Sequence, residues 1–409
     1  MLESPPLSLY VHLPWCVHKC PYCDFNSHVQ RGVLPEGRYI DALIADLELD
    51  LATVSPRPLQ SIFLGGGTPS LFAAEAIARL FEAVRLRVPC SPSMEVTLEA
   101  NPGTIERGRF AEYRSAGVTR LSIGAQSFDD RHLRALGRIH TARETRAAVA
   151  EAQAAGFDDF NLDLMYGLPD QTRAEALADV EAALELAPSH LSHYELTIEP
   201  NTRFHRRPPS LPDDDTRFAM LTVCQARLAG FEHYEVSAFA VPGRRCRHNV
   251  NYWSFGDYLG IGAGAHAKLT DTDSGRVWRT AKLRHPLMYM RHAHDERRIA
   301  VRREVGSAER AFEFMLNALR MPDGFTRQDF EARTGLELER IEAALETGCA
   351  RGLLGRVGAA QWAPTDRGLL FLNDLQALFL PGGPADNAGR SPLAAEWRHE
   401  PHESRSLAG

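Results

Sequence analysis

The stretch SLYVHLPWCVHKCPYCDFNSH, residues 8–28, places three cysteines directly after a short apolar segment. Residues 8–13 are mainly apolar, which predicts a β-strand. Cys16, Cys20 and Cys23 then follow with the spacing C-x-x-x-C-x-x-C. Thiolates are soft ligands that suit iron–sulfur clusters and zinc. The sequence therefore predicts a metal-binding loop at the C-terminal end of a strand.

Three closely spaced thiols are compatible with more than one kind of site. A structural zinc ion takes four ligands, and a nearby histidine would complete the set (His12, His18 or His28). A disulfide with one spare thiol fits less well, because seven cysteines is a low, odd count for this length. A four-iron cluster held by the three cysteines fits best and leaves one iron open to a further ligand. We expect Cys16, Cys20 and Cys23 to hold a [4Fe-4S] cluster.

Strand and helix patterns alternate along the chain as far as residue 230. Helical periodicity is clear at 39–51, where apolar residues recur on one face. Further strand patterns occur at 61–66, 94–100, 120–126, 159–167 and 190–199. Such alternation is typical of parallel βαβ units. We therefore expect an α/β fold, a partial parallel (β/α) barrel of the TIM type.

The alternation of strand and helix patterns ends after residues 257–267. Helical patterns at 308–320 and 340–352, and a hairpin followed by a helix within 351–375, predict a smaller helical, winged-helix-like domain. From residue 381 the chain is polar and rich in Gly and Pro, which predicts a disordered tail. The expected division is a barrel over 1–290, a C-terminal domain over 291–380 and the tail over 381–409.

The composition excludes several classes of function. A net charge of -7 demands no basic face, so we expect no nucleic-acid partner. No apolar run approaches the roughly 18 residues of a membrane span. The first residues have neither the basic nor the long apolar region of a secretory signal. These features predict a cytoplasmic protein.

Polar residues recur where the predicted strands end. The second strand runs into GGGTPS, residues 65–70, where glycines permit close backbone approach and amides are able to bind an anion. Glu99, Gln126, Arg138 and Asp163 follow or lie within the later strands. Each residue alone is explained by a structural hydrogen bond. Their convergence on one barrel rim favours a ligand site there.

The cysteine spacing, with the aromatic Tyr22 before the last cysteine, resembles the signature of the radical S-adenosylmethionine (SAM) superfamily. The resemblance implies that the open iron chelates the amino and carboxylate groups of SAM. It also implies that the reduced cluster cleaves SAM to a 5′-deoxyadenosyl radical. In this arrangement the cofactors carry the chemistry, and the protein positions and shields them.

Over residues 8–380 the chain resembles the branch that contains oxygen-independent coproporphyrinogen III oxidase and the HemW-type heme chaperones. By motif, the resemblance implies these SAM-contacting positions: Tyr10, Gly66, Gly67, Thr68, Glu99, Gln126, Arg138 and Asp163. The oxidase usually has a further cysteine two residues after the third, where this chain has Phe25. It also usually has a longer segment before its first strand. Both differences from the oxidase favour a resemblance to the heme chaperones.

The segment CRHNVNYW, residues 246–253, resembles a motif associated with heme binding in the chaperones. The resemblance implies heme contacts at His248, Asn249, Tyr252 and Trp253. Imidazole is able to ligate iron, and aromatic rings pack on a macrocycle. Alternatively, His248 bonds its own loop and the aromatic rings pack at the rim. Cys246 and His266 are alternative iron ligands. The alternative partners for the heme propionates are Arg244, Arg245 and Arg247.

We therefore expect a heme chaperone that delivers heme to apo-hemoproteins such as a respiratory enzyme. Its cofactors would be the [4Fe-4S] cluster, SAM and heme, with SAM governing oligomerisation or release rather than turnover. Whether the protein is also an enzyme is left open, and no catalytic residue is assigned. The alternatives are oxygen-independent decarboxylation of coproporphyrinogen III and radical chemistry on another substrate. A homodimer and a peripheral membrane association also remain open.

Overall fold

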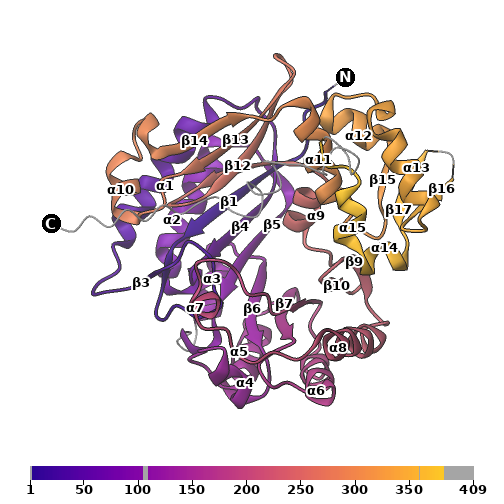
Figure 1. Ribbon diagram of the computed structural model, residues 1–409. Helices are drawn as coiled ribbons and strands as arrows, with labels where there is room; N and C mark the ends of the chain where they lie inside the picture. Colours follow the sequence, from indigo (N-terminus) through magenta and orange to yellow (C-terminus); the bar gives the residue numbers. More distant parts are fainter. Residues whose placement is uncertain (1, 105–108, 359, 382–409) are drawn as a thin grey trace.

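The computed structural model describes residues 2–104, 109–358 and 360–381. A twelve-stranded sheet forms its centre, and six strands of this sheet are parallel neighbours in chain order (Figure 1). Most of their residues are buried, as in sheets covered on both faces. The six are β1 (Leu7–Leu13), β4 (Leu59–Gly66), β5 (Cys90–Ala100), β6 (Arg120–Gln126), β7 (Phe160–Tyr166) and β8 (His190–Glu195).

The sheet does not close into a ring. β11 (Asp257–Ile261) lies parallel to β1 on its other side. β10 (Ala238–Ala240) and β9 (Glu232–Glu235) continue the sheet antiparallel beyond β8. Its two edge strands are β9 and β14 (Ile299–Glu304). The predicted partial barrel is therefore confirmed.

Helices connect the parallel strands, as the periodicity predicts. α5 and α6 begin with capping boxes, in which Thr141 pairs with Glu144 and Thr172 with Glu175, so that backbone donors of the first turn are satisfied. The helices of the barrel are α1 (Glu36–Leu51), α2 (Ala74–Arg87), α3 (Arg109–Ala116), α4 (Asp130–Ala135), α5 (Ala142–Ala154), α6 (Arg173–Leu184), α7 (Arg203–Arg206), α8 (Asp214–Arg227) and α9 (Arg247–Trp253). Single-turn 3-10 helices cover Pro69–Leu71 and Pro102–Thr104.

An antiparallel extension continues the sheet past β11. It consists of β12 (His266–Asp271), β13 (Arg276–Lys282) and β14, with α10 (Pro286–His292) and the 3-10 turn Glu296–Arg298 between the last two strands. Buried ion pairs fix it to α1: Lys282 Nζ lies 2.5 Å from an Asp46 oxygen and 2.7 Å from an Asp50 oxygen, and Arg298 contacts the same two carboxylates. One face of the extension is thereby covered.

A second hydrophobic core forms the C-terminal module. The predicted hairpin is β16 (Leu354–Val357) with β17 (Gln361–Pro364), and β15 (Phe325–Thr326) completes its small sheet. The helices are α11 (Ser307–Ala318), α12 (Arg327–Thr334), α13 (Glu342–Ala350), α14 (Asp366–Leu370) and α15 (Leu372–Ala377), with a 3-10 turn at Leu338–Ile341. The N-terminal segment packs on this module, where the Glu3 amide donates to the Ala332 carbonyl at 2.8 Å (Figure 1).

The predicted boundary at residue 290 lies between β13 and β14. β14 pairs with β13 and so belongs to the large sheet. Apart from Phe255, the buried residues of the second core lie from Ala311 in α11 onward. We therefore propose a boundary between β14 and α11. Residues 382–409, which contain almost all of the predicted tail, lie outside the described residues.

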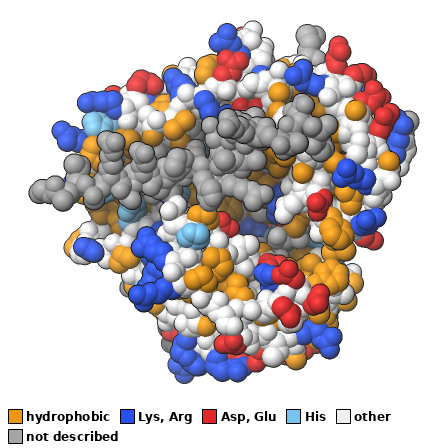
Figure 2. Space-filling model, in the orientation of Figure 1, with side chains coloured by type: hydrophobic (Ala, Val, Ile, Leu, Met, Phe, Trp, Pro, Cys, Tyr) orange, Lys and Arg blue, Asp and Glu red, His pale blue; other side chains and the backbone are white. Residues whose placement is uncertain are grey.

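Basic and acidic side chains both occur across the face shown in Figure 2. Within the described ranges, no helix combines the length and the apolar character needed to cross a membrane.

Candidate functional site

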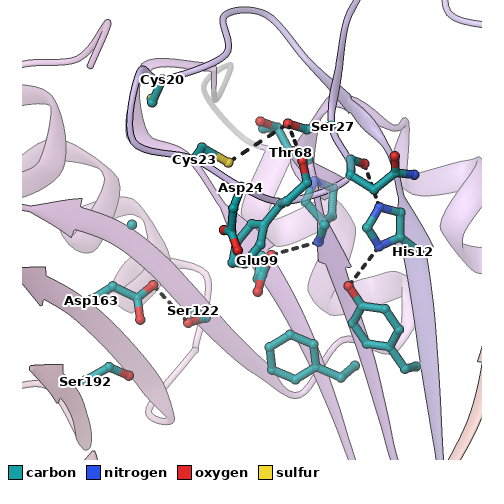
Figure 3. A pocket seen from close by; sticks show the side chains of 18 of the residues that line it. His12, Cys20, Cys23, Asp24, Ser27, Thr68, Glu99, Ser122, Asp163 and Ser192 are labelled. Carbon is teal, nitrogen blue, oxygen red and sulfur yellow. Dashed lines mark hydrogen bonds between the residues drawn. The ribbon is translucent and has the colours of Figure 1, made fainter. Parts of the chain in front are cut away.

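A cavity of about 1100 Å³ opens at the carboxyl ends of the parallel strands. Its wall contains every site residue expected from the sequence, drawn from the first strand to α9: Tyr10, Cys16, Cys20, Cys23, Gly66, Gly67, Thr68, Glu99, Gln126, Arg138, Asp163, His248, Asn249, Tyr252 and Trp253. This is the edge at which ligands bind in parallel α/β sheets. In Figure 3, Cys20 and Cys23 lie on a loop at one end of the strands, and Glu99 and Asp163 project from strands near it.

The cysteine loop is closed by a short parallel pair, β2 (Trp15–Cys16) with β3 (His28–Val29). All seven cysteines are free thiols, so none of the three is in a disulfide. Burial raises the pKa of Cys16 and of Cys23. Cys20 lies beside Arg138, whose Nη1 is 3.9 Å from the sulfur. The loop therefore presents three reduced thiols at the cavity.

The spread of the thiols favours a cluster over a single ion. Two thiolates on one tetrahedral zinc lie about 3.8 Å apart, given a Zn–S distance of about 2.3 Å. Among the described residues, three potential ligand atoms fall within 4.8 Å of one another at a single place, and it is not the cysteine loop. That place, Asp129–His132–Glu175, lies outside the cavity wall, and Arg131 bonds both of its carboxylates. The three thiols fit a [4Fe-4S] cluster, in which each binds a different iron.

Asn26 and His12 hold the cysteine loop in place, although the sequence prediction assigned neither residue this role. Asn26 Nδ2 donates to the carbonyls of Ala263 (2.8 Å) and Arg284 (2.9 Å). His12 Nε2 lies 2.8 Å from the Asn26 carbonyl, and its Nδ1 lies 3.0 Å from the Tyr10 hydroxyl. A carbonyl only accepts, so Nε2 carries the proton. Burial lowers the pKa of His12 to about 4, which keeps this imidazole neutral.

The glycine-rich turn packs closely against the first strand and the cysteine loop. The Gly66 amide donates to Glu99 at 3.2 Å, and the Gly67 and Thr68 amides donate to the carbonyls of Leu13 and Trp15. A Cβ on Gly66 would lie 2.5 Å from the His12 ring. These three amides are therefore engaged within the chain, and the glycines let β4 approach the first strand and the cysteine loop.

Two half-buried carboxyl groups, Glu99 and Asp163, face the cavity from neighbouring parts of the sheet. Burial, with a further contribution from Asp163, raises the pKa of Glu99 to about 8 against the opposing effect of the Gly66 amide. Glu99 is therefore protonated at neutral pH and able to donate a hydrogen bond. Burial also raises the pKa of Asp163, which accepts from Asn161 Nδ2 at 2.8 Å and from the Ser122 hydroxyl at 3.4 Å.

Arg138 and Gln126 complete this part of the wall. Arg138 Nη2 donates to the Gly124 carbonyl at 2.9 Å, and its buried Nε has no hydrogen-bond partner among the described residues. Gln126 has a left-handed backbone (φ 65°) at the end of β6 and accepts from the Tyr194 hydroxyl at 2.8 Å. An unpaired buried donor is costly, so the Arg138 Nε fits an anionic ligand group.

The predicted heme motif forms α9, which packs against β4, β1 and β11. Glu95 accepts from the amides of Arg247 and His248 at its first turn. The His248 Nδ1 lies 3.3 Å from the Ser61 hydroxyl, and its ring lies 5.0 Å from that of Phe63. Burial lowers the pKa of His248 to about 4, so the ring is neutral.

Aromatic side chains line the cavity beside α9. The rings of Tyr252 and Trp253 meet edge to face at 4.8 Å, and Tyr252 also lies 5.3 Å from Tyr258. The Arg320 guanidinium lies 4.4 Å from the centre of the Trp253 ring. This end of the cavity therefore presents aromatic surface with a cation at its edge.

The alternative heme contacts around Cys246 are not supported by their placement. Cys246 is fully buried, lies outside the cavity wall, and donates to Glu95 at 3.4 Å. The three neighbouring arginines also lie outside the wall and bond elsewhere: Arg244 to Asp158, Arg245 to Glu232 and Asp323, Arg247 to Ser93. The basic side chains that do line the cavity are Lys19, Arg138, Lys282, Arg284 and Arg320.

Two family models match the chain. The radical SAM superfamily matches residues 10–183, and the HemN C-terminal domain matches residues 307–371. The heme chaperone HemW of Escherichia coli (strain K12) is 49% identical over 382 residues, which are 93% of this chain and all of that protein. The heme chaperone HemW of Haemophilus influenzae is 47% identical over 93% of this chain and 99% of that protein.

A solved structure also matches the fold. Coproporphyrinogen III oxidase (HemN) from Escherichia coli, described as a radical SAM enzyme, superposes with a TM-score of 0.78 over 92% of this chain and 91% of that chain, at 23% identity. That likeness shows the fold alone, whereas the identity to the chaperones extends over almost the whole sequence. The chain therefore belongs to the HemW heme chaperone family, within the radical SAM superfamily.

Proposed function

We propose that this protein binds heme and delivers it to apo-hemoproteins, with a [4Fe-4S] cluster and SAM bound in the same cavity. The observation that carries the proposal is the joint placement of three free thiols and the aromatic end of α9 around one cavity. Its volume of about 1100 Å³ exceeds the roughly 300–1,000 Å³ of an ordinary small-molecule pocket. Space for more than one ligand is what a cofactor and a cargo require.

Cys16, Cys20 and Cys23 would hold the cluster, which supplies an open iron for the amino and carboxylate groups of SAM. The chain's own contribution is polar contact around that ligand. Arg138 offers its unpaired Nε to a carboxylate. Protonated Glu99 donates, whereas Asp163 accepts, so the two carboxyl groups match different groups of one ligand. Tyr10, Gln126 and the turn at 66–68 complete the wall.

Heme is the cargo in this proposal, and the end of the cavity near α9 suits a porphyrin. His248, Asn249, Tyr252 and Trp253 line it together. Flat aromatic rings pack on a macrocycle, and Arg320 lies close enough to Trp253 to pair with a propionate at the edge. The acceptor that we propose is an apo-hemoprotein such as a respiratory enzyme, reached from the cytoplasm, with homodimer formation and peripheral membrane association as further predictions.

Anaerobic heme titration of the cluster-loaded protein tests this function. We expect the heme absorption band to shift and saturate at one heme per chain, and the bound heme to transfer to an apo-hemoprotein. Replacing the aromatic pair (Tyr252→Ala with Trp253→Ala) should weaken retention, whereas Phe371→Ala, an exposed aromatic of the C-terminal module, should not. Absence of any heme binding by the wild type contradicts the proposal. Formation of protoporphyrinogen from coproporphyrinogen III with SAM and reductant would instead identify an oxidase.

A further inference from the structure

A buried chain of hydrogen bonds leads away from Asp163 across the large sheet, from β7 to β9. Asn161 Nδ2 donates to Asp163 at 2.8 Å, and Asn161 Oδ1 lies 2.7 Å from Nδ1 of His190, its register partner on β8. The other ring nitrogen of His190, Nε2, lies 2.7 Å from the Tyr234 hydroxyl on β9. The Tyr234 oxygen in turn accepts from the amide of Cys246, the N-cap of α9, at 3.4 Å. Of these five residues, only Asp163 lines the cavity.

The two ends of this chain determine the direction of every bond in it. A carboxylate only accepts, so the Asn161 amide turns its nitrogen to Asp163 and its oxygen to His190, which therefore carries a proton on Nδ1. At the far end the Cys246 amide only donates, so the Tyr234 hydroxyl proton is directed to His190 Nε2. Burial lowers the pKa of His190 well below its usual value, which leaves the ring neutral and Nε2 free to accept.

His190 is the member of the chain that keeps the Asn161 amide in this orientation. The Ser122 and Ser192 hydroxyls also contact the amide, at 2.8 and 3.1 Å, but a hydroxyl both donates and accepts and so fits either orientation. A turned amide would face the Asp163 carboxylate with its oxygen, and the two acceptors would repel. Burial raises the pKa of Asp163, and the hydrogen bond from Asn161 acts against that effect. The ionised state of Asp163 therefore depends on how Asn161 is held.

We infer that His190 is a positioning residue for SAM: with its proton on Nδ1 it orients Asn161, which keeps Asp163 available as a hydrogen-bond acceptor for the ligand. The inference rests on the proposed function, in which Asp163 accepts from SAM and Glu99 donates to it. His190 is fully buried and lies outside the cavity wall, so it acts through Asn161 and does not touch the ligand. The different roles of the two carboxyl groups thus depend on a histidine of the neighbouring strand.

Anaerobic binding of labelled SAM to the full-length, cluster-loaded chain tests this role. His190→Leu removes both hydrogen bonds of the ring, and we expect SAM affinity to fall about tenfold, because hydrogen bonds to charged groups contribute to that extent. His190→Gln should keep an affinity close to that of the wild type, since its amide nitrogen is able to donate to Asn161 and its oxygen to accept from Tyr234. Iron and sulfide are measured in each variant, and the bound SAM is expressed per cluster.

His193→Leu is the matched control, because it makes the same substitution on the same strand. His193 is also buried, but its ring lies on the opposite face of β8, where it stacks on Tyr166 at 4.7 Å. This variant should bind SAM as the wild type does. A loss of affinity as large as that in His190→Leu would overturn the inference, because the packing of β8 would then explain both results.

Nitrogen-15 NMR of the histidine side chains is a second readout, which does not need SAM. The wild type should show a neutral His190 ring with its proton on Nδ1, and this signal should be absent from His190→Gln. A proton on Nε2 would overturn the inference, as would wild-type SAM affinity in His190→Leu or equal losses in His190→Leu and His190→Gln. Failure of the wild type to bind SAM would instead overturn the SAM site of the proposed function.

Discussion

Glu99 gives the cavity a measurable pH dependence. The unfolded chain loses this proton near the usual pKa of 4.5, whereas the folded chain keeps it up to about pH 8. Between these values the unfolded state binds fewer protons, so this group makes the free energy of unfolding fall as pH rises. We expect the stability advantage of Glu99→Gln over wild type to grow between pH 5 and pH 8, by up to about 1.4 kcal/mol per pH unit, and then to level off.

Denaturant unfolding of the protein without metal or SAM, at pH 5, 6.5 and 8, measures this advantage. Glu82→Gln, at an exposed position on α2, is the control and should follow the wild type at each pH. Parallel profiles for wild type and Glu99→Gln would show that Glu99 ionises normally in the folded protein.

A glycine is needed at position 66 because there is no room for a side chain, not because its amide is free to bind a ligand. It has φ 112°, which is unfavourable for other residues, and an added Cβ would meet the His12 ring at 2.5 Å. We expect Gly66→Ala to lower the free energy of unfolding by about 2 kcal/mol or more. Gly37→Ala provides the contrast, since its Cβ on α1 would contact nothing within 4 Å and should stabilise the helix by about 0.5 kcal/mol. Equal unfolding midpoints for the two variants would refute the packing argument.

At the scale of single residues, the sequence predicts the cavity wall well. Glu99 and Gln126 were found because each ends a strand, and the ends of parallel strands meet at one edge. Asn26 was missed because its hydrogen-bond partners are 237 and 258 residues away and are backbone carbonyls, which leave no pattern in the sequence. The sequence offers Arg244, Arg245 and Arg247 as partners for heme propionates because local composition does not show which way a side chain points.

Among the elements, the cysteine loop depends on Asn26 for its position. Each hydrogen bond of its amide contributes about 1 kcal/mol, so Asn26→Ala should loosen the loop while the barrel stays folded. We expect release of iron to a chelator under anaerobic conditions to become about tenfold faster. Gln30→Ala is the control, because the Gln30 side-chain amide donates to the carbonyl of nearby Gly32 at 3.2 Å. Unchanged release from Asn26→Ala would mean that the backbone alone holds the loop.

The elements differ in how far the sequence predicts them. Parallel strands joined by helices were located because their two periodicities alternate over a long range. The C-terminal hairpin and the helix after it were also located. For the extension, the sequence shows only that the alternation of strand and helix patterns ends. Its strands are not predicted, because β12 to β14 contain buried charges such as Lys268 and Lys282 that obscure the apolar alternation. The predicted boundary at residue 290 consequently lies before β14, although β14 pairs with β13.

Over the whole molecule, the two hydrophobic cores are joined at Phe255. This residue follows α9 yet belongs to the second core, where its ring lies 5.9 Å from that of Phe314. Arg320 reinforces the junction through Glu235 at 2.6 Å. We expect Phe255→Ala to cost about 3–5 kcal/mol and to destabilise both cores together. Phe371→Ala, which is 51% exposed, should cost little.

Hydrogen exchange measured at β4 and at α12 distinguishes joint from separate unfolding. A shared loss of protection in Phe255→Ala is the expected result, since packing across the junction makes the two cores one cooperative unit. Full protection of α12 while β4 opens would show that the C-terminal module folds independently.

The Asn26 contacts also determine when, during synthesis of the chain, the cysteine loop is able to reach its folded position. The thiols leave the ribosome early, but the carbonyl of Arg284 that anchors their loop is made 258 residues after Asn26. At about 5–20 residues per second, that interval lasts roughly 13 to 50 s. For most of that interval β1 also lacks its partner β11, so the nascent chain exposes unprotected thiols on an unfinished strand edge. We therefore expect iron loading to be a late event that follows the synthesis of Arg284.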